Sequence, residues 1–157
     1  MTIAGALTTK ADAGQQWADH AHAVIRAAGH RSSAPRSAVV QTLAAQSCVR
    51  SAREIGDSLR RDGSEIGIAT VYRALELLDE LGLVQRLDVG EGSARFEPAL
   101  PTGEHHHHVV CDRCGQVSQF EDEGLEAAID RIAERLAYRV GAHDVILRGA
   151  CPDCVRA

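Results

Sequence analysis

Two Cys-x-x-Cys pairs constrain this chain more than any other feature of its sequence. Cys111 and Cys114 form the first pair and Cys151 and Cys154 the second, so residues 115–150 must fold back to bring the pairs together. Each pair places two thiolates a tight turn apart, as a tetrahedral zinc ion with Zn–S bonds of about 2.3 Å requires. Four sulfur ligands leave no open position, so the pattern predicts a structural Zn²⁺ site. A redox disulfide is the alternative, because a single Cys-x-x-Cys often forms one.

A run of four histidines, residues 105–108, lies just before the first cysteine pair. The run is internal and flanked by strand-like sequence, which argues against an expression tag. Side chains of a strand alternate between its faces, so His105 and His107 share one side while His106 and His108 share the other. Two imidazoles of a pair, about 7 Å apart at Cβ, can converge on one ion. The run therefore predicts two separate metal sites, with a solvated polar strand as the alternative.

Composition and charge restrict the class of protein. The 157 residues are 45% hydrophobic, enough for a core, and only 3% aromatic, which disfavours stacking of single-stranded nucleic acid. No apolar run approaches the roughly 20 residues of a bilayer span and no secretion signal opens the chain, so a cytoplasmic protein without a membrane partner is expected. The net charge of −5 falls in residues 97–157, which carry 6 Lys/Arg and 11 Asp/Glu (6 − 11 = −5).

Three helices are predicted at the start of the chain. Apolar residues recur at helical spacing over residues 15–28, and a second helix is expected over residues 35–46, with proline in its first turn. Ser51 and Glu54 match the capping box Ser-x-x-Glu, so a third helix is expected over residues 52–61.

A fourth helix and a hairpin follow. Residues 71–81 carry an apolar stripe that leaves Tyr72 and Arg73 on another face. Strands are expected over residues 83–89 and 93–97, joined by a glycine-bearing turn. Helices followed by such a hairpin are typical of a winged helix.

The rest of the chain predicts a second, smaller domain. Two prolines and a glycine mark a linker, after which strands are expected at residues 105–111 and 116–120, a helix at 124–138 and a last strand at 144–148. The fold class is therefore α+β. The expected divisions are a flexible tail (1–14), a winged-helix DNA-binding domain (15–97), a linker (98–104) and an α/β metal-binding domain (105–157).

Three segments, residues 66–75 with Thr-Val-Tyr-Arg, residues 95–97 and residues 105–115, together resemble the ferric uptake regulator (Fur) superfamily. The resemblance covers roughly residues 15–154. It implies a repressor of metal-uptake or metal-homeostasis genes, not an enzyme, with residues 105–157 as its dimerisation domain. A homodimer on a palindromic double-stranded DNA operator is expected, with Zn²⁺ as structural ion, Zn²⁺ or Fe²⁺ as regulatory ion, and no small organic substrate.

The resemblance also implies ligand sets. Its structural zinc site falls on the four paired cysteines. Its sensing site at the domain junction falls on Glu97, His106 and His108. Its second metal site falls on His105, His107, Glu126 and His143.

Two positions depart from the family pattern. Cys48 lies in a loop where many iron and peroxide sensors have a histidine, and Gln119 replaces an acidic ligand. Cys48 is either a further ligand of the regulatory site or a small buried hydrophobic residue. A thiolate favours zinc over ferrous iron or manganese, so zinc is the expected sensed metal. Iron is the close alternative, followed by peroxide sensing, manganese and nickel.

The fourth helix carries the expected DNA contacts. Arg73 offers paired donors to a base edge or phosphate, and Tyr72 offers a ring to a thymine methyl group. Thr70 is expected to cap the helix or to contact phosphate. The resemblance places Arg31 near the minor groove, and Arg36 is expected on backbone phosphate. A solvated surface position is the alternative for Arg31 and Arg73.

Two other functions compete with regulation. A zinc hydrolase would use Glu97 or Glu126 to activate water, but the chain has no His-Glu-x-x-His or Gly-x-Ser-x-Gly motif. A metal buffer or metallochaperone would bind metal without sequence-specific DNA affinity.

Overall fold

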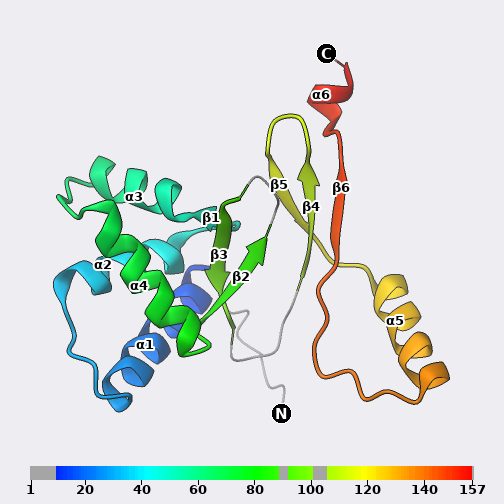
Figure 1. The fold of residues 1–157 in the computed structure, drawn as a ribbon, viewed down its shortest axis with the longest axis horizontal. Coiled ribbons are helices and arrows are strands. Elements are labelled where there is room, and N and C mark those ends of the chain that lie inside the picture. The colour runs from blue at the N-terminus through cyan, green and yellow to red at the C-terminus, as the bar shows by residue number, and fades with distance from the viewer. Residues whose placement is uncertain (1–9, 89–91, 101–105, 157) are drawn as a thin grey trace, which may run out of the picture. The chain divides into compact units, whose positions relative to one another are not determined.

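The structure, a computed structural model, describes residues 10–88, 92–100 and 106–156. These residues form helices and two three-stranded sheets, which confirms the α+β class (Figure 1). The chain divides into two compact units, a first unit of residues 1–103 and a second unit of residues 104–157. Within the described residues, no helix has the length and apolar character that crossing a bilayer requires.

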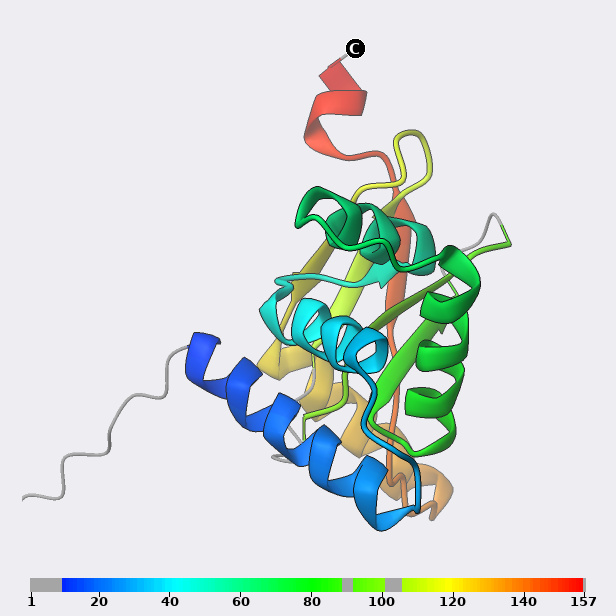
Figure 2. The ribbon, with the colours of Figure 1, turned by 90° about the vertical axis from the view of Figure 1, so that its left-hand side faces the viewer.

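Four helices, coloured blue to green in Figure 2, and a small sheet build the first unit. The sheet is antiparallel with the order β1-β3-β2. The elements are α1 (Lys10–Ala27), α2 (Ala34–Ala45), β1 (Arg50–Ser51), α3 (Ala52–Arg61), α4 (Ile68–Glu80), β2 (Val84–Asp88) and β3 (Ala94–Pro98). Helices followed by the β2–β3 hairpin are the winged helix that the sequence predicts.

The hydrophobic core of the first unit gathers one face of each helix against the sheet. The apolar stripe predicted for residues 71–81 supplies the buried face of α4. The indole N–H of Trp17 donates to the backbone carbonyl of Leu83 at 2.9 Å, so its polar group keeps a partner inside the core. The buried core residues are Trp17, Ala18, Ala21, Ile25, Val39, Val40, Leu43, Ala52, Ile55, Leu59, Val71, Ala74, Leu75, Leu78, Leu83, Val84 and Phe96.

The capping box predicted at the start of α3 is present in full. The N–H of Glu54 donates to the Ser51 hydroxyl at 3.2 Å, and the Ser51 N–H donates to the Glu54 carboxylate at 2.7 Å. The helix runs from Ala52 to Arg61, as predicted. Arg95 of β3 donates to the same carboxylate at 3.0 Å, which ties the hairpin to the start of α3.

The first helix begins earlier than the sequence predicts. It starts at Lys10, so residues 10–14 are helical and do not belong to the flexible tail expected for residues 1–14. The rest of that tail lies outside the described residues. The reason is a close packing contact that apolar periodicity does not register: Gly14 is buried directly against the backbone of Ala44 in α2.

The linker expected for residues 98–104 also begins later. Pro98 is the last residue of β3, and the N–H of Ala99 donates to the carbonyl of Leu83 at 3.0 Å. Leu100 packs against the core of the first unit. Proline is tolerated at a strand end, so its presence did not mark the boundary.

Replacing Gly14 with alanine is expected to destabilise the protein. An added Cβ would lie 2.2 Å from the carbonyl oxygen of Ala44, so α1 must shift away from α2. Overpacking of this kind costs about 1–3 kcal/mol, whereas alanine in an open helix position would stabilise by about 0.5–1 kcal/mol. Urea denaturation measures the change, with Gly141→Ala as control because no atom lies within 4 Å of its added Cβ. A variant as stable as the parent would contradict the α1–α2 packing.

The second unit holds the sheet β5-β4-β6 and two helices. β4 is the central strand, antiparallel to β5 and parallel to β6 (Figure 1). The elements are β4 (His107–Cys111), β5 (Val117–Phe120), α5 (Glu123–Leu136), β6 (Ile146–Gly149) and α6 (Pro152–Arg156). The first four follow the predicted order, and α6 was not predicted.

The second unit has little hydrophobic core of its own. Its buried described residues are His107, His108, Val110 and Cys111. No residue of α5 is buried. Large apolar side chains stay exposed instead: Val109, Ile132, Leu136, Tyr138, Val140, Leu147 and Val155. Exposed apolar residues in this number are typical of a face that a partner covers.

Candidate metal centres and DNA-reading helix

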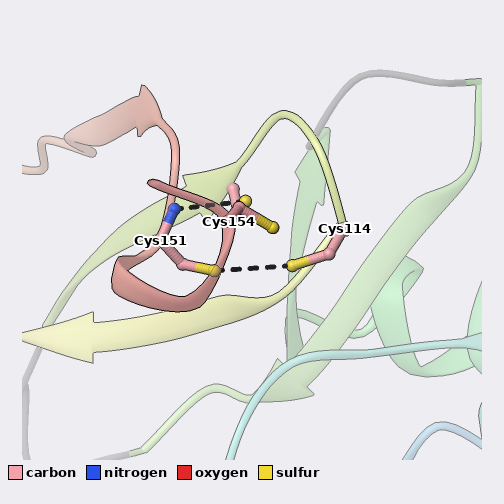
Figure 3. A group of neighbouring side chains, drawn as sticks. Cys114, Cys151 and Cys154 are labelled. Atoms are coloured by element: carbon pink, nitrogen blue, oxygen red, sulfur yellow. Dashed lines mark hydrogen bonds between the residues drawn. The ribbon is translucent and has the colours of Figure 1, made fainter. Parts of the chain in front are cut away.

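The four cysteines of the second unit converge on one point. Figure 3 labels three of them, Cys114, Cys151 and Cys154. Cys111 ends β4 and Cys114 ends the following turn, while Cys151 precedes α6 and Cys154 lies within it. Their sulfur atoms all lie within 4.8 Å of one another, and those of Cys114 and Cys151 are 3.7 Å apart. A tetrahedral ion with Zn–S bonds of about 2.3 Å separates its sulfurs by roughly 3.8 Å, so the donor set fits zinc.

The thiols of this cluster differ in acidity. The backbone N–H of Cys151 donates to the sulfur of Cys111 at 3.3 Å. This bond, together with backbone hydrogen bonds from Cys114 and Arg113, lowers the pKa of the Cys111 thiol to about 6. Hydrogen bonding to Cys151 and Cys114 raises the pKa of the Cys154 thiol to about 12. One thiolate therefore forms readily, while further thiolates accumulate negative charge that a bound cation would offset.

A second cluster lies between β4 and α5. The Nε2 atom of His107 lies 2.6 Å from one carboxylate oxygen of Glu126, and the Nε2 atom of His143 lies 3.1 Å from the other. The ligand atoms of these three residues lie within 4.8 Å of one another, and His107 is only 1% exposed. The structure thus brings together three members of the predicted second metal set. The fourth, His105, lies outside the described residues.

Two residues that the sequence analysis did not single out position this cluster. Asp122 is the N-cap of α5 and accepts a hydrogen bond from the N–H of Leu125 at 2.7 Å, which fixes the turn that carries Glu126. The ring of Phe120 lies 5.5 Å from that of His107. An aspartate just before a helical pattern was the readable signal for the cap.

The predicted sensing residues divide between the two units. In the second unit the rings of His106 and His108 are neighbours, with centroids 4.9 Å apart and planes inclined by 70°. In the first unit Glu97 lies on β3, opposite Gln85 of β2. The strand expected over residues 105–111 starts only at His107, so His106 lies just before β4. His108 is the next residue along β4 after His107, and alternation points these two side chains to opposite faces.

Cys48 is a partly buried residue of the loop between α2 and β1. The side-chain amide of Gln46 donates to the carbonyl of Phe96 at 2.8 Å, and β1 pairs Arg50 with the same residue. Antiparallel pairing therefore carries this loop alongside the end of β3 that holds Glu97. Cys48 itself belongs to none of the described groups whose metal-binding atoms lie within 4.8 Å of one another.

The outer face of α4 presents Tyr72 and Arg73. Tyr72 is 44% exposed, and Arg73 is exposed with its Nε donating to the carbonyl of Ala69 at 3.3 Å. Ile68 in the first turn is also exposed and was not singled out from the sequence. Its position outside the apolar stripe was the available signal. This face combines a cationic, an aromatic and an apolar side chain, which suits a major groove.

Thr70 does not cap α4. The N-cap is Gly67, which makes no side-chain capping bond, and Thr70 lies half-buried in the first helical turn. A cap at Thr70 requires the helix to begin after that residue, but Ile68 and Ala69 are already helical. The other prediction for Thr70, contact with a DNA phosphate, is unaffected.

Arg31 and Arg36 lie on either side of the start of α2. Arg31 is exposed in the preceding turn, whereas Arg36 is half-buried. Arg36 donates from Nη1 to the backbone carbonyl of Arg31 at 2.5 Å. Arg36 therefore shapes the turn that presents Arg31, a role that the sequence did not indicate.

A winged helix with an exposed reading face, joined to a unit of clustered metal ligands, defines a class of metal-responsive, DNA-binding transcription regulators. The family profile of FUR, the ferric uptake regulator family, matches residues 27–148. The chain therefore belongs to the ferric uptake regulator family, whose members are transcription regulators and not enzymes.

Individual relatives agree with this assignment. The ferric uptake regulation protein of Legionella pneumophila is 37% identical over 131 residues, which cover 83% of this chain and 95% of the relative. The Vibrio cholerae ferric uptake regulator superposes with a TM-score of 0.75 at 35% identity, covering 83% of this chain and 98% of that one. The Helicobacter pylori regulator Fur, described as having three functional metal binding sites, gives a TM-score of 0.81 at 25% identity, covering 92% and 95%.

Proposed function

We propose that the protein is a metal-dependent repressor of metal-uptake or metal-homeostasis genes, acting in the cytoplasm. The observation that carries the proposal is the layout of β4. His107 of this strand lies 2.6 Å from Glu126, while His108 points to the other face, and its ring is 4.9 Å from that of His106, which precedes the strand. Imidazoles of two separate groups thus come from three consecutive residues, shortly before the four-cysteine cluster.

The four-cysteine cluster is proposed to hold a structural Zn²⁺. The 3.7 Å separation of the Cys114 and Cys151 sulfurs and the all-sulfur donor set support zinc. Bound zinc would supply no chemistry beyond charge compensation and cross-linking, because four thiolates fill its coordination sphere. The residues of the cluster would hold α6 against the end of β4.

The regulatory site is proposed to comprise Glu97, His106 and His108, with Cys48 as a candidate further ligand. The adjacency of the two imidazoles and the position of the Cys48 loop beside β3 support this set. Ligands drawn from both units would restrict the motion of the DNA-binding unit when the regulatory ion is bound. A hundredfold change in DNA affinity needs a coupling of only about 2.7 kcal/mol.

The second metal site is proposed to comprise His107, Glu126 and His143, with His105 as its fourth member. The contacts of 2.6 and 3.1 Å to the two carboxylate oxygens support the first three. Mixed nitrogen and oxygen donors accept zinc, ferrous iron or manganese.

Ferrous iron and zinc compete as the sensed ion. Curated relatives at 35–40% identity are named ferric uptake regulation proteins, which supports iron. Cys48 supports zinc, because a thiolate is a soft ligand. We take ferrous iron as the first candidate, since Glu97, His106 and His108 alone are an oxygen and nitrogen set.

A homodimer is proposed on the apolar face of the second unit. Ile132, Leu136 and Tyr138 are exposed on and just after α5, and the unit buries few residues of its own. A second copy that covers this face would supply the missing core. Two copies related by a twofold axis would read a palindromic operator.

Metal-dependent DNA binding tests the proposed function. The probe is a palindromic duplex selected by metal-loaded protein from a random library. It is titrated anaerobically with protein that keeps its structural zinc but lacks the regulatory ion, before and after addition of Fe²⁺ or Zn²⁺. Anisotropy is expected to show about hundredfold tighter binding with the regulatory ion. Equal affinity with and without either ion would contradict regulation, and metal binding without any selected sequence would instead indicate a metal buffer.

Replacing Arg73 with alanine is expected to weaken operator binding about ten- to hundredfold. Arg73 is exposed on α4, and a base-contacting arginine is worth about 1–3 kcal/mol. Fluorescence anisotropy with the metal-loaded protein measures the loss. The matched control is Arg139→Ala, which removes an exposed arginine from the second unit and should leave the affinity unchanged. If Arg73→Ala bound the operator as tightly as the parent, Arg73 would lie on a solvated face that does not contact DNA.

A further inference from the structure

Arg113 makes a contact that neither the sequence pattern nor the ligand set explains. It lies in the turn between Cys111 and Cys114, is exposed, and donates from Nη1 to the backbone carbonyl of Cys154 at 2.7 Å. The contact joins the first cysteine turn to the residue that supplies the last thiol. A side chain that is not a ligand therefore links the two halves of the cluster.

The segment that receives this bond is weakly held by packing. α6 has no buried residue, and Val155 within it is 67% exposed. The first turn is better anchored, because the N–H of Asp112 donates to the carbonyl of Gly149 at 2.8 Å. The N–H of Cys151 donates to the sulfur of Cys111 at 3.3 Å, which fixes the chain before α6 rather than the helix itself.

The charge of Arg113 also matches the occupied site. Four thiolates around one divalent cation carry a net charge of about −2. Arg113 is next to Cys114 in the sequence, and its guanidinium would offset part of that charge. Its hydrogen bond to Cys154 is also charged, and charged hydrogen bonds are roughly twice as strong as neutral ones. Arg113 thus combines a fixed hydrogen bond with a favourable charge.

We propose that Arg113 is a positioning residue of the structural zinc site, which holds α6 so that the Cys154 thiol faces the other three. This inference rests on the zinc site of the proposed function. Residues that orient ligands typically change metal affinity about 10- to 100-fold when they are replaced. Arg113→Ala is therefore expected to release zinc at least about tenfold faster than the parent.

The experiment uses the full-length zinc-loaded protein and a chromophoric chelator that reports zinc release. Arg113→Lys keeps the charge and one donor, Arg113→Gln keeps a donor without the charge, and Arg139→Ala is the matched loss of an exposed arginine. Release rates are expected to rise in the order parent, lysine, glutamine and alanine variant, with Arg139→Ala equal to the parent. Amide hydrogen exchange of α6, in which Val155 donates to the carbonyl of Cys151 at 2.9 Å, should accelerate in Arg113→Ala and stay unchanged in Arg139→Ala.

The outcomes separate the two proposals. A parent protein without zinc, or one that keeps zinc after Cys151→Ser, would overturn the zinc site and this inference with it. If the parent holds zinc and Arg113→Ala releases it at the same rate, only the role of Arg113 is overturned. An equal acceleration in Arg139→Ala would assign the effect to net charge and also overturn the positioning role.

Discussion

Replacing Cys151 with serine is expected to remove the structural zinc ion and to unfold the second unit. This unit buries few side chains, and α6 buries none, so hydrophobic packing cannot hold it alone. Apparent zinc binding free energies in small zinc domains are about 10–16 kcal/mol, which matches or exceeds the roughly 5–15 kcal/mol stability of a whole domain. Loss of the ion therefore removes most of what stabilises this part of the chain.

Three measurements check this prediction. Zinc per chain by elemental analysis should fall to near zero, the far-ultraviolet circular dichroism should lose strand signal, and size-exclusion chromatography should show the loss of the dimer. Cys48→Ser is the matched control, because Cys48 lies outside the four-cysteine cluster and its replacement should leave the structural zinc in place. A Cys151→Ser protein that stays zinc-loaded and dimeric would show that the cysteines do not carry the metal.

The helices of the first unit were predictable because local signals agreed with the tertiary fold. The Ser51–Glu54 capping box set the start of α3 without any help from distant residues. Gly82, with φ +67, ends α4 where its apolar stripe stops. Both signals act within one helical turn, so the sequence alone contains them.

The elements that were missed depend on distant partners. β1 has two residues and exists only because Arg50 and Ser51 pair with β3. α6 is a helix of five residues, with Cys151 before it and Cys154 within it, and it is too short to show apolar periodicity. The early start of α1 depends on the contact of Gly14 with α2.

The candidate sites were predictable to a different degree. The four-cysteine cluster and the separation of His106 and His108 from His107 followed from spacing and strand alternation. The hydrogen bond from Arg113 to Cys154 could not be predicted in this way. It links residues far apart in the sequence, and its acceptor is a backbone carbonyl, which every residue possesses.

The double variant His106→Ala/His108→Ala is expected to abolish the response of DNA binding to metal. These two imidazoles are neighbours and are proposed to supply the nitrogen ligands of the regulatory site. Without them the coupling of about 2.7 kcal/mol should vanish, so the metal-loaded protein should bind operator about a hundredfold more weakly than the parent. Affinity without the regulatory ion should stay unchanged, because the reading face of α4 is untouched.

Operator anisotropy, with and without the ion, measures both affinities, and elemental analysis should still find the structural zinc. His20→Ala is the control, since His20 is exposed on α1 and belongs to no described metal-binding group. Truncation of a buried side chain such as His108 could weaken the fold, so the unfolding transition is recorded in parallel. If the double variant is stable and its DNA binding still responds fully to metal, His106 and His108 are not the ligands of the regulatory ion. His143→Ala would then show whether the cluster of His107, Glu126 and His143 senses the ion, because that cluster lies on the opposite face of the same strand.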